Sequence, residues 1–515
     1  MTRRRLIGSA FATGLVGCRD AQSPALTGER ANLWLDARGH RLREPLADRP
    51  EPDRAVDVLI VGAGVAGLAC AWALARRGFA GSVEIVDLGE QIGGTATFGE
   101  SGGLPYPWGA HYLTLPSRET THVVEMLADL GVVTGLEGDK PIFHPRMLCA
   151  APEERIFQAG RFVHGLWPTD LARAEDDAQL AAFEAACEAW TRRVGTDGRP
   201  AFAIPVAAAS RDPEIRALAA VPFATWLTTQ GFASTFLLQY IDYCCRDDYG
   251  VDSTAVSAWA GLHYFASRRP DPGDARDLGT HVLTWPEGNG WLVRRLREKV
   301  PWAPRLGRVL RAVERDGRAW IEHEGTVSGV QARHVVLAVP GFVASRLAGA
   351  PRRVDHAPWL VAQLPVSRLP RSTGVQGAWD SVIHGAAGLG YVNNAHQTLG
   401  PAGAAVLTYY RPVASRQELL DTPWELAAHG ILDELRPAHP DIDEVVTRLD
   451  TWAWGHGTAI PGVGTHALDA EGRPALDALA TPIGALHFAH ADLSGISLFE
   501  EASFHGIRAA GEILG

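Results

Sequence analysis

An apolar run that passes directly into a glycine-rich turn constrains the fold of this chain more than any other feature. Residues 58–61 are typical of a buried strand, and Gly62, Gly64 and Gly67 follow with the spacing Gly-x-Gly-x-x-Gly. The first glycine permits a tight turn, the second lets the backbone approach a pyrophosphate, and the third lets a helix pack on the strand. A helix over 68–77 would offer its free N-terminal N–H groups to phosphate oxygens. The pattern predicts a strand, a turn and a helix that hold a dinucleotide.

A second strand and an acid complete this unit. Residues 83–86 are the predicted strand, and Asp87 follows it, 25 residues after Gly62. At this place Asp87 can accept hydrogen bonds from ribose hydroxyls. Because all the parts occur in order, we expect the whole turn and the acid to contact the dinucleotide. The expected contacts are Gly62, Ala63, Gly64, Val65, Ala66, Gly67 and Asp87.

Length and charge bound the architecture and the partners. At 515 residues the chain is too long for one core and suggests two closely joined domains. A net charge of −11 argues against a nucleic-acid partner, and we expect a small-molecule substrate. The 48 basic residues include only two lysines, Lys140 and Lys299, which limits any mechanism that needs a catalytic lysine. The cysteines do not show the spacing of a metal site, so no metal is expected.

The first residues resemble an export signal. Arg3 and Arg4 precede a short apolar stretch over 6–17, as in twin-arginine signals, and this stretch is too short to span a bilayer. Residues 15–18 resemble a bacterial lipobox, in which Cys18 would carry lipid; the alternative is a signal peptide with an incidental cysteine. We expect export to the cell envelope or periplasm, with a membrane anchor at Cys18. The expected segments are the signal at 1–18 and a tether and surface arm at 19–54.

Several later segments are similar to those of the flavin-containing amine oxidase superfamily, whose relatives include carotenoid desaturases and protoporphyrinogen oxidases. Asp87 and the pair at 93–94 resemble the family's ribose-binding acid and the glycines that pass the pyrophosphate. The segment 108–112 resembles the element near the isoalloxazine ring, and 284–292 resembles the return into the cofactor domain. The resemblance adds these expected cofactor contacts: Gly93, Gly94, Thr95, Gly109, Ala110 and, on a strand that faces the adenine, Leu310.

The C-terminal segment resembles the family's second flavin motif, in which a strand ends in an acid before a helix begins under the flavin ring. The N-terminal N–H groups of such a helix stabilise negative charge on the reduced ring. The usual Phe-Ala-Gly-acid is replaced here by a sequence with His490, Ala491 and Asp492. Which of these three contacts the flavin stays open, with Asp492 favoured. Ile496 completes the expected contacts.

Two nucleotide-binding motifs at opposite ends of the chain favour FAD over a nicotinamide dinucleotide. A pyridine-nucleotide flavoenzyme would carry a second complete Gly-x-Gly-x-x-Gly in mid-chain, and the sequence has none. The expected fold is α/β: an FAD-binding Rossmann-like domain built from discontinuous segments, with an interleaved α+β substrate domain. The expected FAD-binding domain comprises 55–115, 285–345 and 471–515. The expected substrate-binding domain comprises 116–284, with a mostly helical pattern, and 346–470.

The resemblance also points to the chemistry. Flavin amine oxidases often place a lysine, through water, near the reactive ring nitrogen, but the corresponding stretch 378–391 has no lysine. Rapid reoxidation by dioxygen is then not assured, so the electron acceptor is dioxygen or another compound. The aromatic run 452–457 is the candidate wall of the substrate site, with a core strand as the alternative. The expected catalytic residues are His111, Trp454 and His456.

A run of aromatic, cysteine and charged residues at 243–249 has two possible roles. Residues 243–249 could line a substrate funnel, but an ion-pair network at a helix junction is the more common role of such a run. It is therefore left out of the catalytic set. The leading hypothesis is an FAD-dependent oxidoreductase of the amine oxidase-like group that oxidises a C–N or C–C bond. The alternatives are a carotenoid- or isoprenoid-type desaturase or isomerase acting on an apolar polyene, and a non-catalytic envelope flavoprotein.

Overall fold

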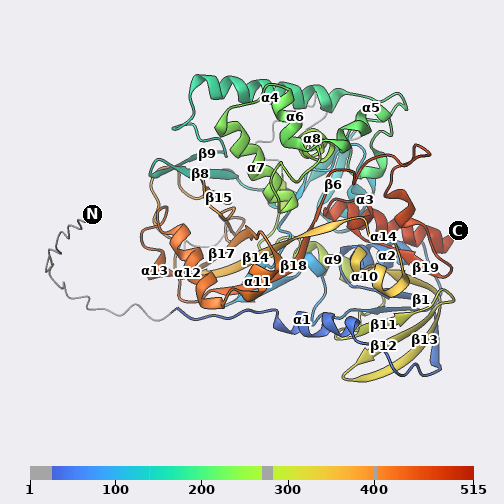
Figure 1. The fold of residues 1–515 in the computed structure, drawn as a ribbon. Helices are drawn as coiled ribbons and strands as arrows, with labels where there is room; N and C mark the ends of the chain where they lie inside the picture. Colours follow the sequence, from blue (N-terminus) through green and yellow to red (C-terminus); the bar gives the residue numbers. More distant parts are fainter. Residues whose placement is uncertain (1–25, 139, 269–281, 399–402) are drawn as a thin grey trace, which may run out of the picture.

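The computed structural model describes residues 26–138, 140–268, 282–398 and 403–515 (Figure 1). The predicted signal, with Arg3, Arg4 and Cys18, lies outside the described residues. Within the described ranges, none of the helices combines the length and the hydrophobicity that a membrane crossing requires.

The dinucleotide unit lies in a sheet assembled from three distant parts of the chain. In the described chain its strand order is β11-β12-β13-β1-β2, with β19 paired to β13. The central strand β1 runs parallel to β13 and to β2, so the turn after β1 lies at the carboxyl edge of the sheet. The strands are β1 (Pro52–Val61), β2 (Val83–Val86), β11 (Val309–Val313), β12 (Arg318–His323), β13 (Thr326–Leu337) and β19 (Leu486–Phe488).

Helices from both ends of the chain cover this sheet (Figure 1). Helix α2 (Val65–Arg76) follows the glycine turn, and the C-terminal helix α14 (Phe499–Leu514) packs against it. Gly506 permits the close approach, because a Cβ there would lie 2.2 Å from the carbonyl oxygen of Ala66. The remaining helices of this part are α3 (Thr121–Asp129), α9 (Gly290–Lys299) and α10 (Gly341–Ala348). The predicted discontinuous Rossmann-like architecture is confirmed.

A second, mostly antiparallel sheet forms the other half of the molecule. Its order in the described chain is β18-β14-β17-β16-β15-β8-β9. The strands are β8 (Glu154–Gln158), β9 (Arg161–His164), β14 (Asp355–Val366), β15 (Asp380–Ile383), β16 (Tyr391–Asn393), β17 (Ala405–Pro412) and β18 (Asp450–Ile460). The helices α11 (Arg416–Asp421), α12 (Trp424–Leu435) and α13 (Ile442–Val445) lie beside it.

The predicted helical character of 116–284 is only partly correct. Helices α4 (Ala174–Arg192), α5 (Pro213–Arg216), α6 (Phe223–Thr229), α7 (Thr235–Tyr249) and α8 (Ala258–Ser267) form a separate layer, at the top of Figure 1. Residues 133–164, however, form two hairpins. The turn between β8 and β9 places Ala159 and Gly160 at φ of 44° and 83°, the positive values that a two-residue hairpin turn requires. The first of these two hairpins is formed by β6 (Val133–Glu137) and β7 (Lys140–Phe143), and β3 (Phe98–Ser101) and β4 (Leu104–Pro107) form another. Strand β5 (Tyr112–Thr114) pairs with the distant β10 (Val282–Thr284).

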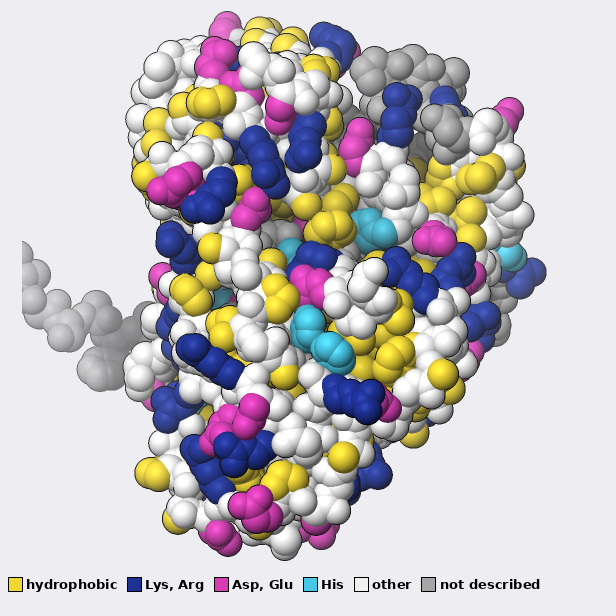
Figure 2. Space-filling model, turned by 90° about the vertical axis from the view of Figure 1, so that its right-hand side faces the viewer, with side chains coloured by type: hydrophobic (Ala, Val, Ile, Leu, Met, Phe, Trp, Pro, Cys, Tyr) yellow, Lys and Arg dark blue, Asp and Glu magenta, His cyan; other side chains and the backbone are white. Residues whose placement is uncertain are grey.

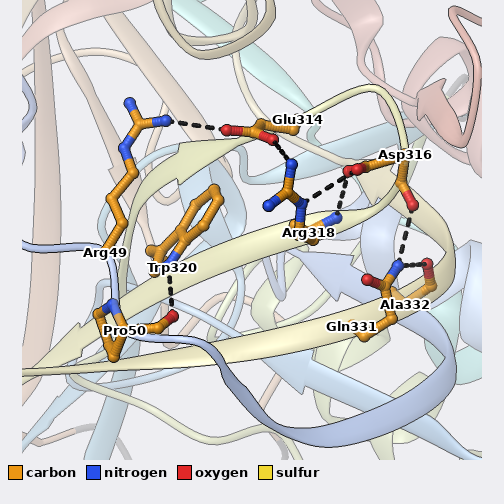
Figure 3. Close-up of polar contacts among 8 residues, drawn as sticks. All are labelled: Arg49, Pro50, Glu314, Asp316, Arg318, Trp320, Gln331 and Ala332. Atoms are coloured by element: carbon orange, nitrogen blue, oxygen red, sulfur yellow. Dashed lines mark hydrogen bonds and ion pairs between the residues drawn. The ribbon is translucent and has the colours of Figure 1, made fainter.

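The N-terminal arm contacts both halves of the molecule. The backbone of Thr27 pairs with the segment before β18, where its carbonyl accepts from the N–H of Leu449 at 2.8 Å. After helix α1 (Leu33–His40), the arm reaches the outer face of the β11–β13 meander (Figure 3). There Arg49 pairs with Glu314 at 3.0 Å, and the indole N–H of Trp320 donates to the carbonyl of Pro50 at 3.0 Å. The part of the predicted arm that is described is therefore built into the fold.

Charges of both signs are interspersed on the face shown in Figure 2, with apolar side chains between them. Among the described residues, no group of three or more His, Cys, Asp or Glu side chains is placed to hold a metal ion.

Candidate functional site

The fold requires glycine at two of the three glycine positions of the first turn. Gly62 has φ of 108°, and a Cβ there would lie 2.3 Å from the carbonyl oxygen of Ala338. A Cβ on Gly67 would lie 1.9 Å from the carbonyl oxygen of Gly62. Gly64 has φ of −76°, and its nearest neighbour to a Cβ, the oxygen of Gly93, is 3.7 Å away. The fold therefore demands glycine at 62 and 67, but neither conformation nor packing demands it at 64.

A second glycine segment borders the space beside Gly64. The N–H of Gly93 donates to the carbonyl of Ala63 at 2.9 Å, and Gly93 pairs with Gly64 as an isolated bridge. Gly94 has φ of 58°, a left-handed conformation that favours glycine. Helix α2 begins at Val65, and no side chain caps its N-terminus. This cradle fits a pyrophosphate, because a side chain at 64 would fill the space and the N–H groups of the first helical turn are free to donate.

Asp87 follows β2, and its carboxylate also stabilises the glycine turn. Its Oδ2 accepts the N–H of Ala63 at 2.6 Å, and its Oδ1 accepts the N–H of Gly89 at 2.6 Å. Burial raises the pKa of this carboxyl, although both hydrogen bonds oppose the rise. A carboxylate has about four acceptor sites, so two remain for other donors. Leu310, the expected adenine neighbour, lies buried on β11 with the backbone of Ile321 opposite it.

The second motif ends in a buried carboxylate with one free acceptor. Asp492 Oδ2 accepts the N–H of Gly341 at 2.7 Å and Nε2–H of His356 at 2.9 Å. His490 Nδ1 lies 3.1 Å from Asp492 Oδ1, but it also accepts the backbone N–H of Asp492 at 3.1 Å. Apart from this contact with the His490 ring, Oδ1 has no hydrogen-bond donor among the described residues. An orphaned, buried acceptor at this place fits a ribityl or ribose hydroxyl. Ile496 is buried in the core of the helical layer.

A cavity joins the expected flavin segments to the second sheet. Its empty volume, counted with adjoining solvent, is about 900 Å³. Thr95, Gly109 and Ala110 line it from the cofactor side, together with His111 and Trp454. The structure thus brings together five residues that were predicted from distant segments. The other lining residues are Tyr112, Leu113, Thr114, Asp247, Asp248, Asn289, Trp359, Val361, Tyr410, Gly457, Thr458, Ser497, Leu498, Phe499 and Glu500.

One side of the cavity is an aromatic wall tied to the 108–111 segment. The rings of His111 and Tyr410 stack with centroids 4.4 Å apart, and the hydroxyl of Tyr410 donates to the carbonyl of Gly109 at 3.0 Å. The indole N–H of Trp454 donates to the carbonyl of Trp108 at 2.6 Å. Burial lowers the pKa of His111 to about 4, so its ring is neutral at pH 7. The wall is therefore rigid, aromatic and uncharged.

Carboxylates also line the cavity. Burial, and then the charge of Asp248, raise the pKa of Asp247 to about 7. Asp248 itself pairs with Arg268 at 2.6 Å. Glu500, in the first turn of α14, accepts from the hydroxyl of Thr114 at 3.1 Å, and burial raises its pKa. Neither Asp247 nor Glu500 has an ion-pair partner among the described residues, and Asp247 has a side-chain hydrogen bond with Tyr112.

The sequence prediction set these acids aside. The run 243–249 was left out of the site, yet helix α7 brings its Asp247 and Asp248 into the cavity wall. Trp359 and Tyr410 were also missed, because nothing in β14 or β17 distinguishes a residue that faces the cavity from one in the core. The signal that could have found Asp247 is the pair of adjacent acids that follows the apolar and aromatic residues of this helix.

His456 lies apart from this group. Its ring stacks on Phe342 at 4.0 Å, and it does not line the cavity. Burial lowers its pKa to about 3. The pairing of β14 with β18 shifts between Ala357 and Trp359, opposite the stretch that contains His456. Neither Lys140 nor Lys299 lines the cavity.

Comparisons with known proteins agree with this geometry. Residues 60–130 match the family model of the NAD(P)-binding Rossmann-like domain. Comparison with curated protein sequences gave no match. Among solved structures, putrescine oxidase bound to putrescine is similar at 18% identity and a TM-score of 0.64, over 89% of this chain and 99% of the other. The chain shares its fold with putrescine oxidase.

Two further structures have this fold. Cyclohexylamine oxidase from Brevibacterium oxydans IH-35A is 18% identical with a TM-score of 0.61, over 89% of this chain and 98% of the other. A fatty acid isomerase from P. acnes that produces CLA is 15% identical with a TM-score of 0.55, also over 89% and 98%. The expected fold class is confirmed. At these identities the comparisons show the fold and not the substrate.

Proposed function

We propose that this chain is an FAD-dependent oxidoreductase of the amine oxidase-like group that oxidises a C–N bond of a small amine. The observation that carries the proposal is the cavity that Thr95, Gly109 and Ala110 line together with Asp247 and an aromatic wall. The space beside Gly64 and the orphaned Oδ1 of Asp492 fit the cofactor. The amine oxidases that share the fold support the reaction class.

The residues of the cavity divide the work of binding and orienting the substrate. Asp247, when ionised, would accept hydrogen bonds from a substrate ammonium group. The rings of Tyr410, His111 and Trp454 would hold the carbon skeleton and exclude water. The polar atoms of Tyr410 and Trp454 are already bonded to the 108–111 segment. FAD, when bound, supplies the hydride acceptor for the substrate C–H. The free N–H groups at the start of α14 would favour negative charge near Phe499.

Anaerobic substrate screening tests this proposal. The purified flavoprotein is mixed with a panel of primary, secondary and diamines and with apolar polyenes, and loss of the flavin's visible absorption is followed. Bleaching by amines supports the proposal. Bleaching or substrate isomerisation by polyenes alone would favour the desaturase or isomerase alternative. No reduction by any compound would favour a non-catalytic flavoprotein.

The electron acceptor is a separate question. No lysine lines the cavity, so we propose that dioxygen reoxidises the reduced protein slowly and that another acceptor serves it better. Stopped-flow reoxidation by air-saturated buffer, compared with an artificial quinone, measures the two rates directly. A faster reaction with dioxygen would contradict this proposal.

On the sequence alone, we also propose export and lipid attachment. The support is the arginine pair at 3–4, the apolar stretch 6–17 and Cys18. Twin-arginine export carries folded proteins, and this suits a protein that binds its cofactor before export.

A further inference from the structure

The structure has a second cavity, and the segment 493–500 runs between it and the first. It is lined from three parts of the chain, within 206–216, 465–477 and 493–505, and its empty volume with adjoining solvent is about 440 Å³. Ser494 lines this cavity, whereas Ser497 lines the first. No expected cofactor contact and no residue of the first cavity lines it. Its chemistry is therefore independent of the proposed oxidation site.

A buried guanidinium without a carboxylate partner lines this cavity. Arg216 is 3% exposed and lies over the ring of Trp259, 4.8 Å from its centroid. Its Nε donates to the carbonyl of Ser210 at 2.7 Å and its Nη1 to that of His466 at 3.4 Å. Nη2 makes no hydrogen bond with a described residue, and no described carboxylate lies within ion-pair distance. Burial lowers the pKa of Arg216 to about 10, so it is charged at pH 7.

The other groups of the cavity leave this charge uncompensated. Arg211 and Asp477 pair with each other at 3.0 Å and cancel. Burial lowers the pKa of His466 to about 3 and that of His505 well below its usual range, so both rings are neutral at pH 7. The cavity therefore carries a net charge of +1, located on Arg216.

Hydroxyl and ring groups add to the donors and acceptors available there. The hydroxyl of Thr465 makes no hydrogen bond with a described residue. His466 donates from Nε2 to the carbonyl of Ser494 at 2.9 Å, and its buried Nδ1 has no partner. A buried charge normally has an ion-pair partner, and an unsatisfied buried polar atom calls for a missing one.

We propose that the second cavity is a binding site for a small oxyanion, a carboxylate or a phosphate, held by Arg216 and the hydroxyl of Thr465. The planar fork of a guanidinium matches two oxygens of such a group, and Nη2 with the remaining N–H of Nη1 is free to donate. An anion of one negative charge neutralises the cavity. Leu493 and Ser494 line this cavity and the residues 497–500 line the first, so one short segment borders both.

Anion binding to the full-length flavoprotein tests the proposal. Sodium acetate and sodium phosphate are titrated by calorimetry, and the Tm is followed at constant ionic strength with chloride as the reference. A saturable heat and a saturable rise in Tm are expected for at least one of the two anions. The larger effect identifies the oxyanion as a carboxylate or a phosphate.

Variants separate a binding role of Arg216 from a purely structural one. R216Q should weaken binding roughly ten- to hundred-fold, as expected for the loss of charge-assisted hydrogen bonds. T465V should weaken it several-fold without touching the guanidinium, which keeps the test decisive if R216Q does not fold. R333Q removes one charge from an 81% exposed side chain and should leave binding unchanged. Absence of saturable binding in the unmodified protein, or equal affinities in T465V and the unmodified protein, would overturn the proposal.

Discussion

At the scale of single residues, the glycines of the first turn separate the requirements of the fold from those of the ligand. We predict that Gly64→Val abolishes flavin binding but leaves the protein folded, because only the ligand's space is filled. Gly67→Val should instead prevent folding, since its Cβ would lie 1.9 Å from the oxygen of Gly62. Flavin content and circular dichroism measure the two effects. Gly430→Val, at a helical position where a Cβ meets nothing within 4 Å, is the control.

Asp87 is predicted to act in both the turn and the ligand site. Asp87→Ala removes the acceptor of the N–H groups of Ala63 and Gly89 together with any ribose contact. The loss of one charge-assisted hydrogen bond to the ribose costs about 1.5–3 kcal/mol, so flavin affinity should fall roughly ten- to hundred-fold. Fluorescence titration of the apoprotein with FAD measures this change. Asp87→Asn should recover part of the affinity; unchanged affinity in both variants would contradict the assignment.

Asp247 in the cavity predicts that kcat/KM depends on pH. The pKa of Asp247 is raised to about 7, so the carboxylate that would bind an ammonium group forms as pH rises through this value. Amines stay protonated over this range, with pKa values near about 10. The kcat/KM for an amine should therefore increase as pH rises through about 7. In Asp247→Asn it should fall roughly ten- to hundred-fold and lose this dependence. Asp421→Asn, on the exposed α11, should retain both.

The roles of single residues were predictable where one short segment contains all the residues that bind the ligand. Gly62, Gly64, Gly67 and Asp87 belong to one local unit, and their roles follow from spacing. Asp247, Tyr410 and Trp359 come from helix α7 and strands β17 and β14, so only the tertiary fold places them in one wall.

At the scale of elements, prediction succeeded where one pattern repeats over the whole element. The strand 83–86 was predicted with the bounds that β2 has. The helix expected over 68–77 begins earlier, since α2 runs Val65–Arg76. The hairpins within 133–164 were missed because their strands are short and β8 gains its partner β15 from residues more than 200 positions away.

Helix α14 is predicted to couple stability to pH through Glu501. This buried acid accepts the N–H of Val206 at 2.7 Å and the hydroxyl of Ser494, and burial raises its pKa to about 7. The folded state therefore holds a proton that the unfolded state releases at lower pH. Its contribution to stability is present below the unfolded pKa and is lost as pH rises through about 7.

Glu501→Gln should accordingly reduce the fall of Tm between about pH 5 and about pH 8. Thermal denaturation at several pH values measures the slope. Other buried acids such as Asp380, whose pKa burial also raises, will keep part of it. Glu425→Gln, at an exposed position in the first turn of α12, should leave the slope unchanged; an equal slope in both variants would contradict the prediction.

At the scale of the whole molecule, the sequence predicted the architecture of the two halves but not the contacts between them. The discontinuous cofactor domain follows from two motifs at opposite ends of the chain. The cavity between the halves depends on how β14 and β18 lie against the 108–111 segment, for example through Gln363, which donates to the carbonyl of Pro107 at 2.6 Å. No local pattern encodes such a contact.

Location is a property of the whole chain, and it gives the last prediction. Replacing Arg3 and Arg4 with lysine should leave precursor in the cytoplasm, because the arginine pair is what the export system reads. Cys18→Ala should prevent lipidation and release the protein from the membrane. Cell fractionation and mass spectrometry of the mature N-terminus measure both. A mature protein that begins well beyond Cys18 would rule out the anchor and leave soluble export.

The way the N-terminal arm is fastened sets how far an anchored molecule could stand from its membrane. From Cys18 to Leu26, where the described arm starts, eight residues of chain can span at most about 30 Å. Thr27 is already paired to the second sheet, and Arg49 to the first. With lipid on Cys18, this short tether would keep the protein close to the membrane and restrict its rotation. It would meet its substrate in a thin layer at the bilayer surface, so amines concentrated by anionic headgroups would reach it at more than their bulk concentration.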